Sequence, residues 1–456
     1  MIARIALGVF LLATVGSARV VSASSPTHRG ASRPATLQAR IDAASPGSTL
    51  KIPHGTYIGD LVLRKPLRLV GIGRPLLVAG GAGTVVQIRA ADVTIDGFDI
   101  DGKAKGDLGD DSSGIHIAAP RATIRNCRIR DTLFGIYLRE AHGAVVDRCT
   151  IRGIPGKEPG EKGSGIHVWN TNGYRLTNND VTLVRDGFYI QSSSNGMVKG
   201  NVARDLRYGL HYMYSDDNAF EDNLFANGAA GAALMYSRRI TFRRNRFVHN
   251  RGFASVGLLL KACDDVIAED NLIADNARGI FLEGSYRNVI RRNVIASSDT
   301  ALVLYDSCAE NRIEDNSFLA NLTPLTFIGR RTDTIFRGNY WSDNREPDLD
   351  GDGLSDRPYR IGSVFDHFRG NVSAADLFGG TFATVALEAA ETMLPILDVI
   401  PVEDSAPLVR PPQRPGVPMM QASARRVDVA GILSSLCLAS FGSAILIAGR
   451  RKGVRA

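Results

Sequence analysis

The stretch NVARDLRYGLHYMYSDDNAFEDNLFANGAAGAALMYSRRITFRRN, residues 201–245, repeats two markers at a single spacing. Asparagine recurs at Asn201, Asn223 and Asn245, and glycine opens an alternating apolar segment at Gly209 and again at Gly231. Each step is 22 residues, which is a length typical of one coil of a solenoid.

Both markers continue on either side of this stretch and share the same two insertions. The asparagine series is Asn126, Asn179, Asn201, Asn223, Asn245, Asn271, Asn293, Asn316 and Asn339, with Arg148 filling one slot. The glycine series is Gly114, Gly135, Gly165, Gly187, Gly209, Gly231, Gly257 and Gly279. A leucine-rich repeat would need a dense leucine pattern that is absent. The sequence therefore predicts an all-β fold, a right-handed parallel β-helix over residues 37–345 with asparagines stacked at one turn.

Composition and charge limit the class of protein. The chain has 456 residues, 44% hydrophobic and 22% charged, which excludes a disordered chain and a wholly membrane-embedded one. The net charge is +7, of which residues 1–23 carry +2 and residues 425–456 carry +5. Residues 24–424 are thus neutral overall, and no nucleic-acid partner is expected.

The two ends are typical of an exported protein with a membrane anchor. Residues 1–23 have the form of a signal peptide, followed by a polar leader over 24–36. Residues 429–449 are 21 residues without a charge, long enough for a transmembrane helix, and 450–456 form a basic cytoplasmic tail. We expect a periplasmic protein tethered to the inner membrane; a sorting tail that is later removed would have the same pattern.

Shorter segments flank the repeats. A short helix is predicted at the start of the β-helix, where it would close the open end of the solenoid. Residues 346–380 form an acidic loop and cap region, 381–400 an amphipathic helix, and 401–428 a Pro-rich linker.

The acidic loop offers a calcium pattern. In DLDGDGLSDRPY, residues 348–359, the carboxylates have the spacing of a calcium loop, but position 12 is Tyr359 instead of glutamate. Calcium and a cluster of Asx turns remain equal alternatives. The candidate ligands are Asp348, Asp350, Asp352 and Asp356.

Two cysteines, Cys127 and Cys149, fall on neighbouring repeat positions. That placement allows a disulfide, but buried free thiols are the preferred interpretation.

The strand after each glycine alternates between an apolar inward face and an unusual outward face. Outward positions hold His211, Met213 and Met235 on adjacent coils, with His167 two coils away. Thioether sulfur and imidazole nitrogen are ligands that suit copper, especially Cu(I). The alternative is that another segment covers this face and the residues pack there.

Four segments on these coils carry a resemblance to a known family: GLHYMYS (209–215), GAALMYS (231–237), GNYWSDN (338–344) and DLDGDGLSDRPY. Over residues 37–412 they resemble NosD, the periplasmic β-helical protein of nitrous oxide reductase maturation. The resemblance implies copper supply to that reductase, together with an ABC transporter permease and ATPase and a copper lipoprotein chaperone. It also implies that the protein is not an enzyme.

A different class, an exported carbohydrate-active enzyme or polysaccharide-binding module, shares the β-helix fold. Such enzymes need clustered carboxylates or a base beside acids. The outward face offers Arg139, Lys261 and Glu283, spread over several coils, with Asp264 and Asp265 at a turn. This class is therefore kept as the alternative.

Overall fold

The structure is a computed structural model that describes residues 36–361, apart from 82, 107, 253 and 254, together with 381–393 and 402–412. The predicted signal peptide, the transmembrane segment 429–449 and the basic tail 450–456 lie outside these residues, as do most of the leader and linker. Within the described part, no helix is both long and apolar enough to cross a membrane.

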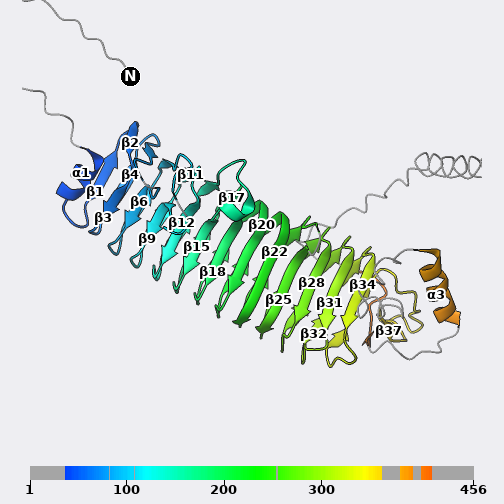
Figure 1. Cartoon of the computed structure of the whole chain (residues 1–456). Helices are drawn as coiled ribbons and strands as arrows, with labels where there is room; N and C mark the ends of the chain where they lie inside the picture. The colour runs from blue at the N-terminus through cyan, green and yellow to red at the C-terminus, as the bar shows by residue number, and fades with distance from the viewer. Residues whose placement is uncertain are drawn as a thin grey trace, which may run out of the picture.

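The chain forms a right-handed parallel β-solenoid of about 13 turns, as the repeat predicts (Figure 1). Each full coil supplies three short strands, and each strand pairs in parallel with its equivalent one coil later. The first stack consists of β1 (Thr49–Ile52), β4 (Arg68–Gly71), β7 (Thr94–Asp96), β10 (Thr123–Arg125), β13 (Val145–Asp147), β16 (Arg175–Thr177), β19 (Met197–Lys199), β21 (Ala219–Glu221), β23 (Thr241–Arg243), β26 (Ile267–Glu269), β29 (Val289–Arg291), β32 (Arg312–Glu314) and β35 (Ile335–Arg337).

The other two stacks belong to one large sheet. One contains β2 (Thr56–Ile58), β5 (Leu76–Val78), β8 (Asp99–Asp101), β11 (Arg128–Arg130), β14 (Thr150–Arg152), β17 (Asp180–Thr182), β24 (Arg246–Val248), β27 (Leu272–Ala274), β30 (Val294–Ala296), β33 (Ser317–Leu319) and β36 (Tyr340–Trp341). The other contains β3 (Leu61–Leu63), β6 (Val86–Ile88), β9 (Ser113–Ile117), β12 (Phe134–Arg139), β15 (Ser164–Trp169), β18 (Asp186–Gln191), β25 (Val256–Asp264), β28 (Arg278–Glu283), β31 (Thr300–Tyr305) and β34 (Thr323–Ile328).

Two long strands join these stacks in the middle of the molecule. β20 (Val202–Met213) and β22 (Leu224–Arg238) each run through both stacks without a break, and they pair along their length. They carry His211, Met213 and Met235, so the candidate site lies on the longest strands of the solenoid.

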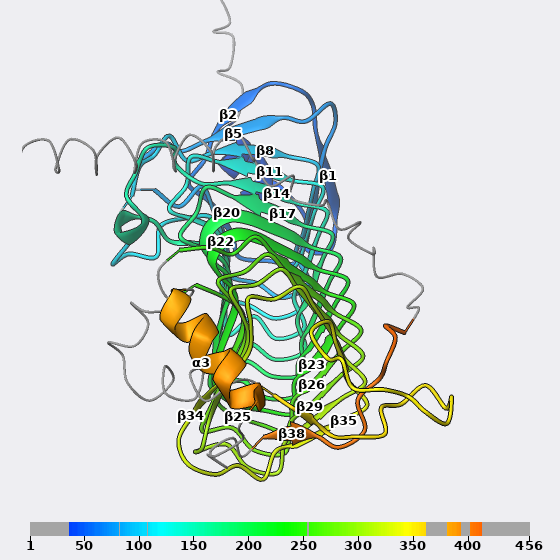
Figure 2. The same ribbon diagram turned by 90° about the vertical axis from the view of Figure 1, so that its right-hand side faces the viewer.

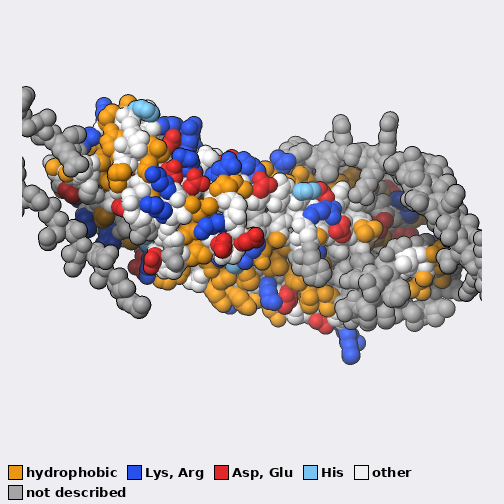
Figure 3. All heavy atoms as spheres, turned by 45° about the horizontal axis from the view of Figure 1, so that its top comes forward, with side chains coloured by type: hydrophobic (Ala, Val, Ile, Leu, Met, Phe, Trp, Pro, Cys, Tyr) orange, Lys and Arg blue, Asp and Glu red, His pale blue; other side chains and the backbone are white. Residues whose placement is uncertain are grey.

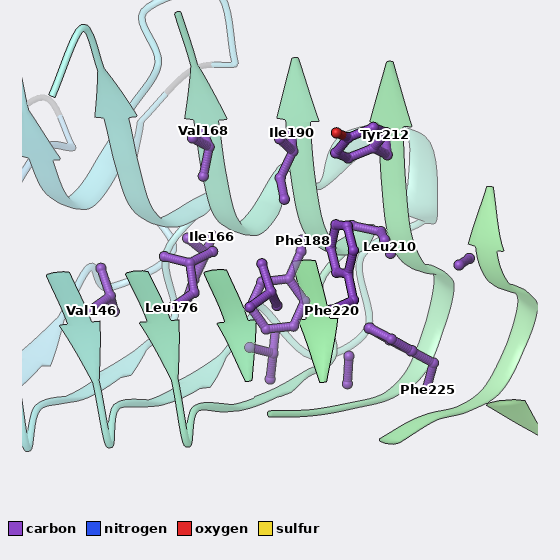
Figure 4. Close-up of a cluster of buried hydrophobic side chains, with 14 of the residues drawn as sticks. Val146, Ile166, Val168, Leu176, Phe188, Ile190, Leu210, Tyr212, Phe220 and Phe225 are labelled. Atoms are coloured by element: carbon purple, nitrogen blue, oxygen red, sulfur yellow. The ribbon is translucent and has the colours of Figure 1, made fainter. Parts of the chain in front are cut away.

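The bore of the solenoid is apolar, as the inward face predicts. Ile166, Phe188, Ile190 and Leu210 are fully buried there, and Tyr212 joins them with its hydroxyl donating to the carbonyl of Ser215 (Figure 4). Like side chains stack on like through successive coils: the rings of Phe220 and Phe242 lie parallel, with centroids 4.8 Å apart. This packing of apolar side chains is the main stabilising contribution of the fold.

Asparagines form the predicted ladder. The side-chain amide of Asn201 donates to Oδ1 of Asn223 at 2.9 Å, and Asn223 donates to Asn245 at the same distance. Each Oδ1 also accepts a backbone N–H from the coil before it, and each Nδ2 donates to a carbonyl, so these buried polar groups are satisfied.

In two early coils the predicted ladder position was wrong: it lies one residue later in the chain. Asn126 and Arg148 align with Asn178, whereas Cys127 and Cys149 occupy the ladder position. The Cys149 N–H donates to Oδ1 of Asn179, and neither cysteine is in a disulfide. The adjacent asparagines at 178 and 179 allow either alignment, and the glycine spacing of 30 residues supports the observed one.

The glycine that opens each long strand lies where two coils meet closely. A Cβ on Gly209 would be 2.6 Å from the carbonyl oxygen of Gly231 and 2.7 Å from the ring of Phe225. Only glycine leaves room there, which explains the second sequence marker.

The two ends of the solenoid are closed differently. At the start, α1 (Leu37–Ala43) buries Leu37 and Ile41 over the bore.

At the other end α3 (Phe382–Met393) occupies part of the predicted helix 381–400 (Figure 1). The linker prediction for 401–428 was wrong for residues 403–404, because β38 (Glu403–Asp404) pairs with β35 and with β37 (Tyr359–Arg360). There Asp404 accepts the hydrogen bonds of Asn339, which ends the asparagine ladder.

Candidate functional site

The candidate copper ligands lie on the outward face of β15, β18, β20 and β22. In the sheet register His167 aligns with Tyr189, Tyr189 with His211, and His211 with Ala233. Two residues along the strands, Met213 aligns with Met235 on the next coil. The predicted neighbourhood of the two methionines and the two-coil separation of His167 are therefore confirmed.

Histidines and tyrosines alternate along this column and contact one another. The ring of His167 stacks between those of Tyr137 and Tyr189, each at a centroid distance of 4.4 Å. The ring of His211 meets Tyr189 edge-on at 4.8 Å, and His116 meets Tyr137 edge-on at 5.1 Å. The column is thus a continuous ladder of aromatic rings across five coils.

Part of this ladder is covered, as the packing alternative expects. One insertion of the repeat is the polar segment at residues 153–165. Its Ile154 packs with Leu133, Phe134 and Tyr137, as does Leu108 from an earlier loop. The insertion contains the short 3-10 helix η1 (Pro159–Glu161), which stands out from the side of the solenoid (Figure 2). Packing therefore accounts for the aromatic residues at this end of the ladder.

His167 lies in this covered part and not with the methionines. Burial lowers its pKa to about 3, so its imidazole is neutral. Its Nδ1 is buried and has no hydrogen-bond partner among the described residues. Because the ring of Tyr189 lies between His167 and His211, the structure separates His167 from the other three candidates.

His211 has a different environment at the other end of the ladder. Its side chain is 13% exposed, and its Nδ1 lies 3.3 Å from Oδ2 of the fully buried Asp186. Two nitrogens of Arg207 donate to the same carboxylate, at 2.9 and 2.7 Å. Burial alone would raise the pKa of Asp186, but the hydrogen bonds of His211 and Arg207 outweigh burial and lower it.

Met213 and Met235 are both half-buried, and Ala233 beside His211 is buried against Ala230 and Val256. The Tyr189 hydroxyl lies 3.9 Å from the sulfur of Met213 and donates to Gln191 at 2.8 Å. The residue after His211 in its column is Ala233, whose side chain is a single methyl group. One imidazole and two thioethers thus share a patch on two adjacent coils, a donor set that suits Cu(I).

Asp186, Arg207 and Tyr189 were missed as site residues from the sequence. Asp186 directly precedes a marker glycine, and this position aligns with Ser164 and Tyr208 in the neighbouring coils. A single acidic residue among these aligned positions was the feature of the sequence that could have indicated a functional role for Asp186.

The other outward residues considered for carbohydrate chemistry do not form one cluster. Lys261 and Glu283 pair with each other at 3.0 Å, and the guanidinium of Arg139 lies 5.2 Å from the centre of the Trp169 ring. These two pairs lie on opposite sides of the methionines along the solenoid.

The predicted calcium loop brings three of its four acids together. Carboxylate oxygens of Asp348, Asp350 and Asp352 lie within 4.8 Å of one another, whereas Asp356 accepts the backbone N–H of Leu349. The three grouped acids also accept backbone N–H groups of their own loop, as Asx turns do. Calcium at this loop stays a prediction.

Comparisons with known proteins agree with this architecture. Residues 152–346 match the family described as periplasmic copper-binding protein (NosD), and residues 78–216 match the right-handed beta helix region. The match to NosD includes every strand that carries His211, Met213 and Met235. Over these residues the chain is similar to NosD, and it has the β-helix fold.

Two curated relatives are both named probable ABC transporter binding protein NosD. The protein of Stutzerimonas stutzeri is 29% identical, with 79% of this chain and 87% of the relative covered. The protein of Pseudomonas aeruginosa is 28% identical, with 78% and 87% covered. Among solved structures, the A-module of the mannuronan C-5 epimerase AlgE4 of Azotobacter vinelandii has a TM-score of 0.50 and 16% identity, covering 65% of this chain and 94% of that one. This likeness is one of fold.

Proposed function

We propose that this NosD-like protein binds Cu(I) at His211, Met213 and Met235 and passes it on in the periplasm. The alignment of Met213 with Met235 beside His211 carries the proposal. Neutral imidazole and thioether ligands leave the charge of Cu(I) uncompensated, which favours reversible binding and suits a transfer protein. Copper is the cargo here, and the final acceptor would be nitrous oxide reductase.

The names of the relatives support a partner for this transfer. Both are named probable ABC transporter binding protein, so we propose that this chain works with a permease and its ATPase. Receipt of copper from a lipoprotein chaperone is part of the same proposal and rests on the resemblance of the sequence. Membrane tethering by residues 429–449 would place the solenoid beside that permease.

The proposed role is not enzymatic. The carboxylate nearest to His211, that of Asp186, is fully buried and held by Arg207. It is therefore poorly placed to act as an acid or base on a polysaccharide outside the solenoid. Conversion of polymannuronate or another acidic polysaccharide by the purified chain would contradict this part of the proposal.

The test is the replacement of both Met213 and Met235 with leucine. Leucine preserves apolarity and approximate volume, so the cost in stability is under about 1.5 kcal/mol per site. Competition with the chromophoric chelator bicinchoninate should show at least a tenfold loss of Cu(I) affinity. Met197→Leu is the matched control, since Met197 lies half-buried on β19, away from the outward site. Equal affinity of the double variant and the wild type would disprove the site.

A further inference from the structure

Asp186 is a buried carboxylate that the proposed copper ligands do not include. It has no exposed surface, and its partners are the residue just before β18 and two residues of β20. Arg207 donates to both carboxylate oxygens, and Nε of Arg185 lies 3.3 Å from Oδ2. Two guanidinium groups thus hold a negative charge in one place behind the imidazole of His211.

The contact between Asp186 and His211 selects one form of the imidazole. A carboxylate held by arginines is an acceptor, so the Nδ1 that faces it at 3.3 Å must carry the proton. Arg207 also approaches Nδ1, at 3.5 Å, but its shorter contacts are with the carboxylate. With the proton on Nδ1, the lone pair of the neutral ring lies on Nε2.

Ring contacts fix the orientation of the same imidazole. Tyr189 and Tyr208 meet the His211 ring edge-on, at centroid distances of 4.8 and 5.2 Å. Arg207 in turn lies over the ring of Tyr208, with its guanidinium carbon 4.3 Å from the ring centre. Asp186, Arg207 and two tyrosines therefore form a rigid support on one side of His211.

We infer that Asp186 is a positioning residue that presents Nε2 of His211 to the cargo metal ion. The inference rests on the proposed binding of Cu(I) by His211. A carboxylate that accepts the second N–H of a ligating histidine orients the ring and makes the other nitrogen a better ligand. Asp186 contacts no metal itself and acts only through His211.

A double-mutant cycle with Cu(I) as the probe tests this role. Asp186→Asn in the full chain should lower the Cu(I) affinity about 10- to 100-fold in bicinchoninate competition. In a His211→Ala background, the same change should have no further effect, because the residue through which Asp186 acts is gone. An equal loss of affinity in both backgrounds would overturn the inference.

Glu269→Gln is the matched control. Glu269 is also a buried carboxylate, 2% exposed, and Arg243, Arg291 and Arg292 hold it. None of the histidines that the structure describes contacts it. The control should keep the wild-type affinity. If Asp186→Asn does not fold, Arg207→Lys replaces it in the cycle, since lysine cannot hold the carboxylate at two points.

A measurement without copper separates this inference from the proposed function. In the metal-free chain with ¹⁵N-labelled histidine, the ring signals lost in His211→Ala identify His211. These signals should show the proton on Nδ1 in the wild type and a shift toward the other form in Asp186→Asn. A wild-type proton on Nε2 would overturn the positioning role. Absence of Cu(I) binding with the expected proton on Nδ1 would instead overturn the proposed function alone.

Discussion

At the scale of single residues, burial gives two histidines of one column different properties. His167 is enclosed by aromatic rings and has no charged partner in contact among the described residues. His211, two coils later, contacts Asp186 of the coil before it. From the sequence the two differed only in their distance from the methionines, because both occupy the same outward position of the repeat. The contacts that separate them come from the insertion at one end and from Asp186 at the other.

The buried imidazole of His167 predicts an acid-sensitive fold. Its pKa falls from 6.5 to about 3 on folding, so the unfolded chain binds a proton that the folded one does not, and the free energy of unfolding decreases as the pH falls through 6.5 toward 3. His167→Phe retains an aromatic ring and removes this linkage. Between about pH 7.5 and about pH 5, the drop in Tm should be smaller by about 2 °C or more in the variant.

The control for this prediction is His142→Phe, because His142 is exposed at a turn and its Nδ1 contacts only the backbone N–H of Asn172. Thermal unfolding followed by circular dichroism at both pH values gives the comparison. The same pH dependence in His167→Phe and in the wild type would show that His167 is not the residue responsible.

At the scale of elements, the asparagine ladder predicts a large effect of a single truncation. In Asn223→Ala, the N–H and side-chain amide of Asn201 lose their acceptor, and the carbonyl of Val198 loses its donor. All are buried, so the expected cost is about 1–3 kcal/mol for each group left unsatisfied, unless water enters. Urea denaturation should therefore show a clear loss of stability.

Asn172→Ala provides the matched control for the ladder. Asn172 is exposed, and its Oδ1 accepts one backbone N–H, that of Ser194, which water can replace. Its loss should stay within about 1 kcal/mol. If both variants lost the same stability, burial of the ladder would not be its stabilising feature.

The repeat predicted the elements well because two independent markers report the same coil. Glycine marks a close approach between backbones, as at Gly209, and asparagine marks a buried amide at a turn, as at Asn223. The shift of the ladder to Cys127 and Cys149 was not predicted. Cysteine replaces asparagine at these two ladder positions, so the asparagine series does not mark them in the sequence. The outward side chains are less constrained by the repeat, which explains why Asp186 was missed.

At the scale of the whole molecule, opposite charges of successive coils neutralise each other along one turn. Arg239 contacts Asp217 at 2.6 Å, and Arg244 contacts Asp222 at 2.7 Å, each across one coil. Lys and Arg are interspersed with Asp and Glu on the face shown in Figure 3. These exposed pairs contribute little individually, but they leave no broad basic surface on that face.

Asp404 covers the last coil of the solenoid, and we expect this contact to keep the exposed strand edge from pairing with another chain. Asp404 is fully buried, and its Oδ2 accepts the backbone N–H of Asn339 at 3.1 Å, its amide at 2.8 Å and the indole N–H of Trp341 at 3.1 Å. Asp404→Ala removes the acceptor of all three donors. The ladder would then end in unpaired polar groups at a strand edge, which can pair with another chain.

We therefore expect Asp404→Ala to lower the Tm and to shift the chain toward larger species in size-exclusion chromatography. Proteolysis near residues 346–361 should also become faster, since β38 no longer holds this segment through β37. Asp404→Asn is the control, because an amide oxygen can still accept from Asn339 and Trp341. An Asp404→Ala chain with the elution profile and protease resistance of the wild type would mean that the extension closes the solenoid by other contacts. A loss confined to the alanine variant would instead identify the acceptor oxygen of one side chain, far from the repeat in sequence, as the terminus of the asparagine ladder.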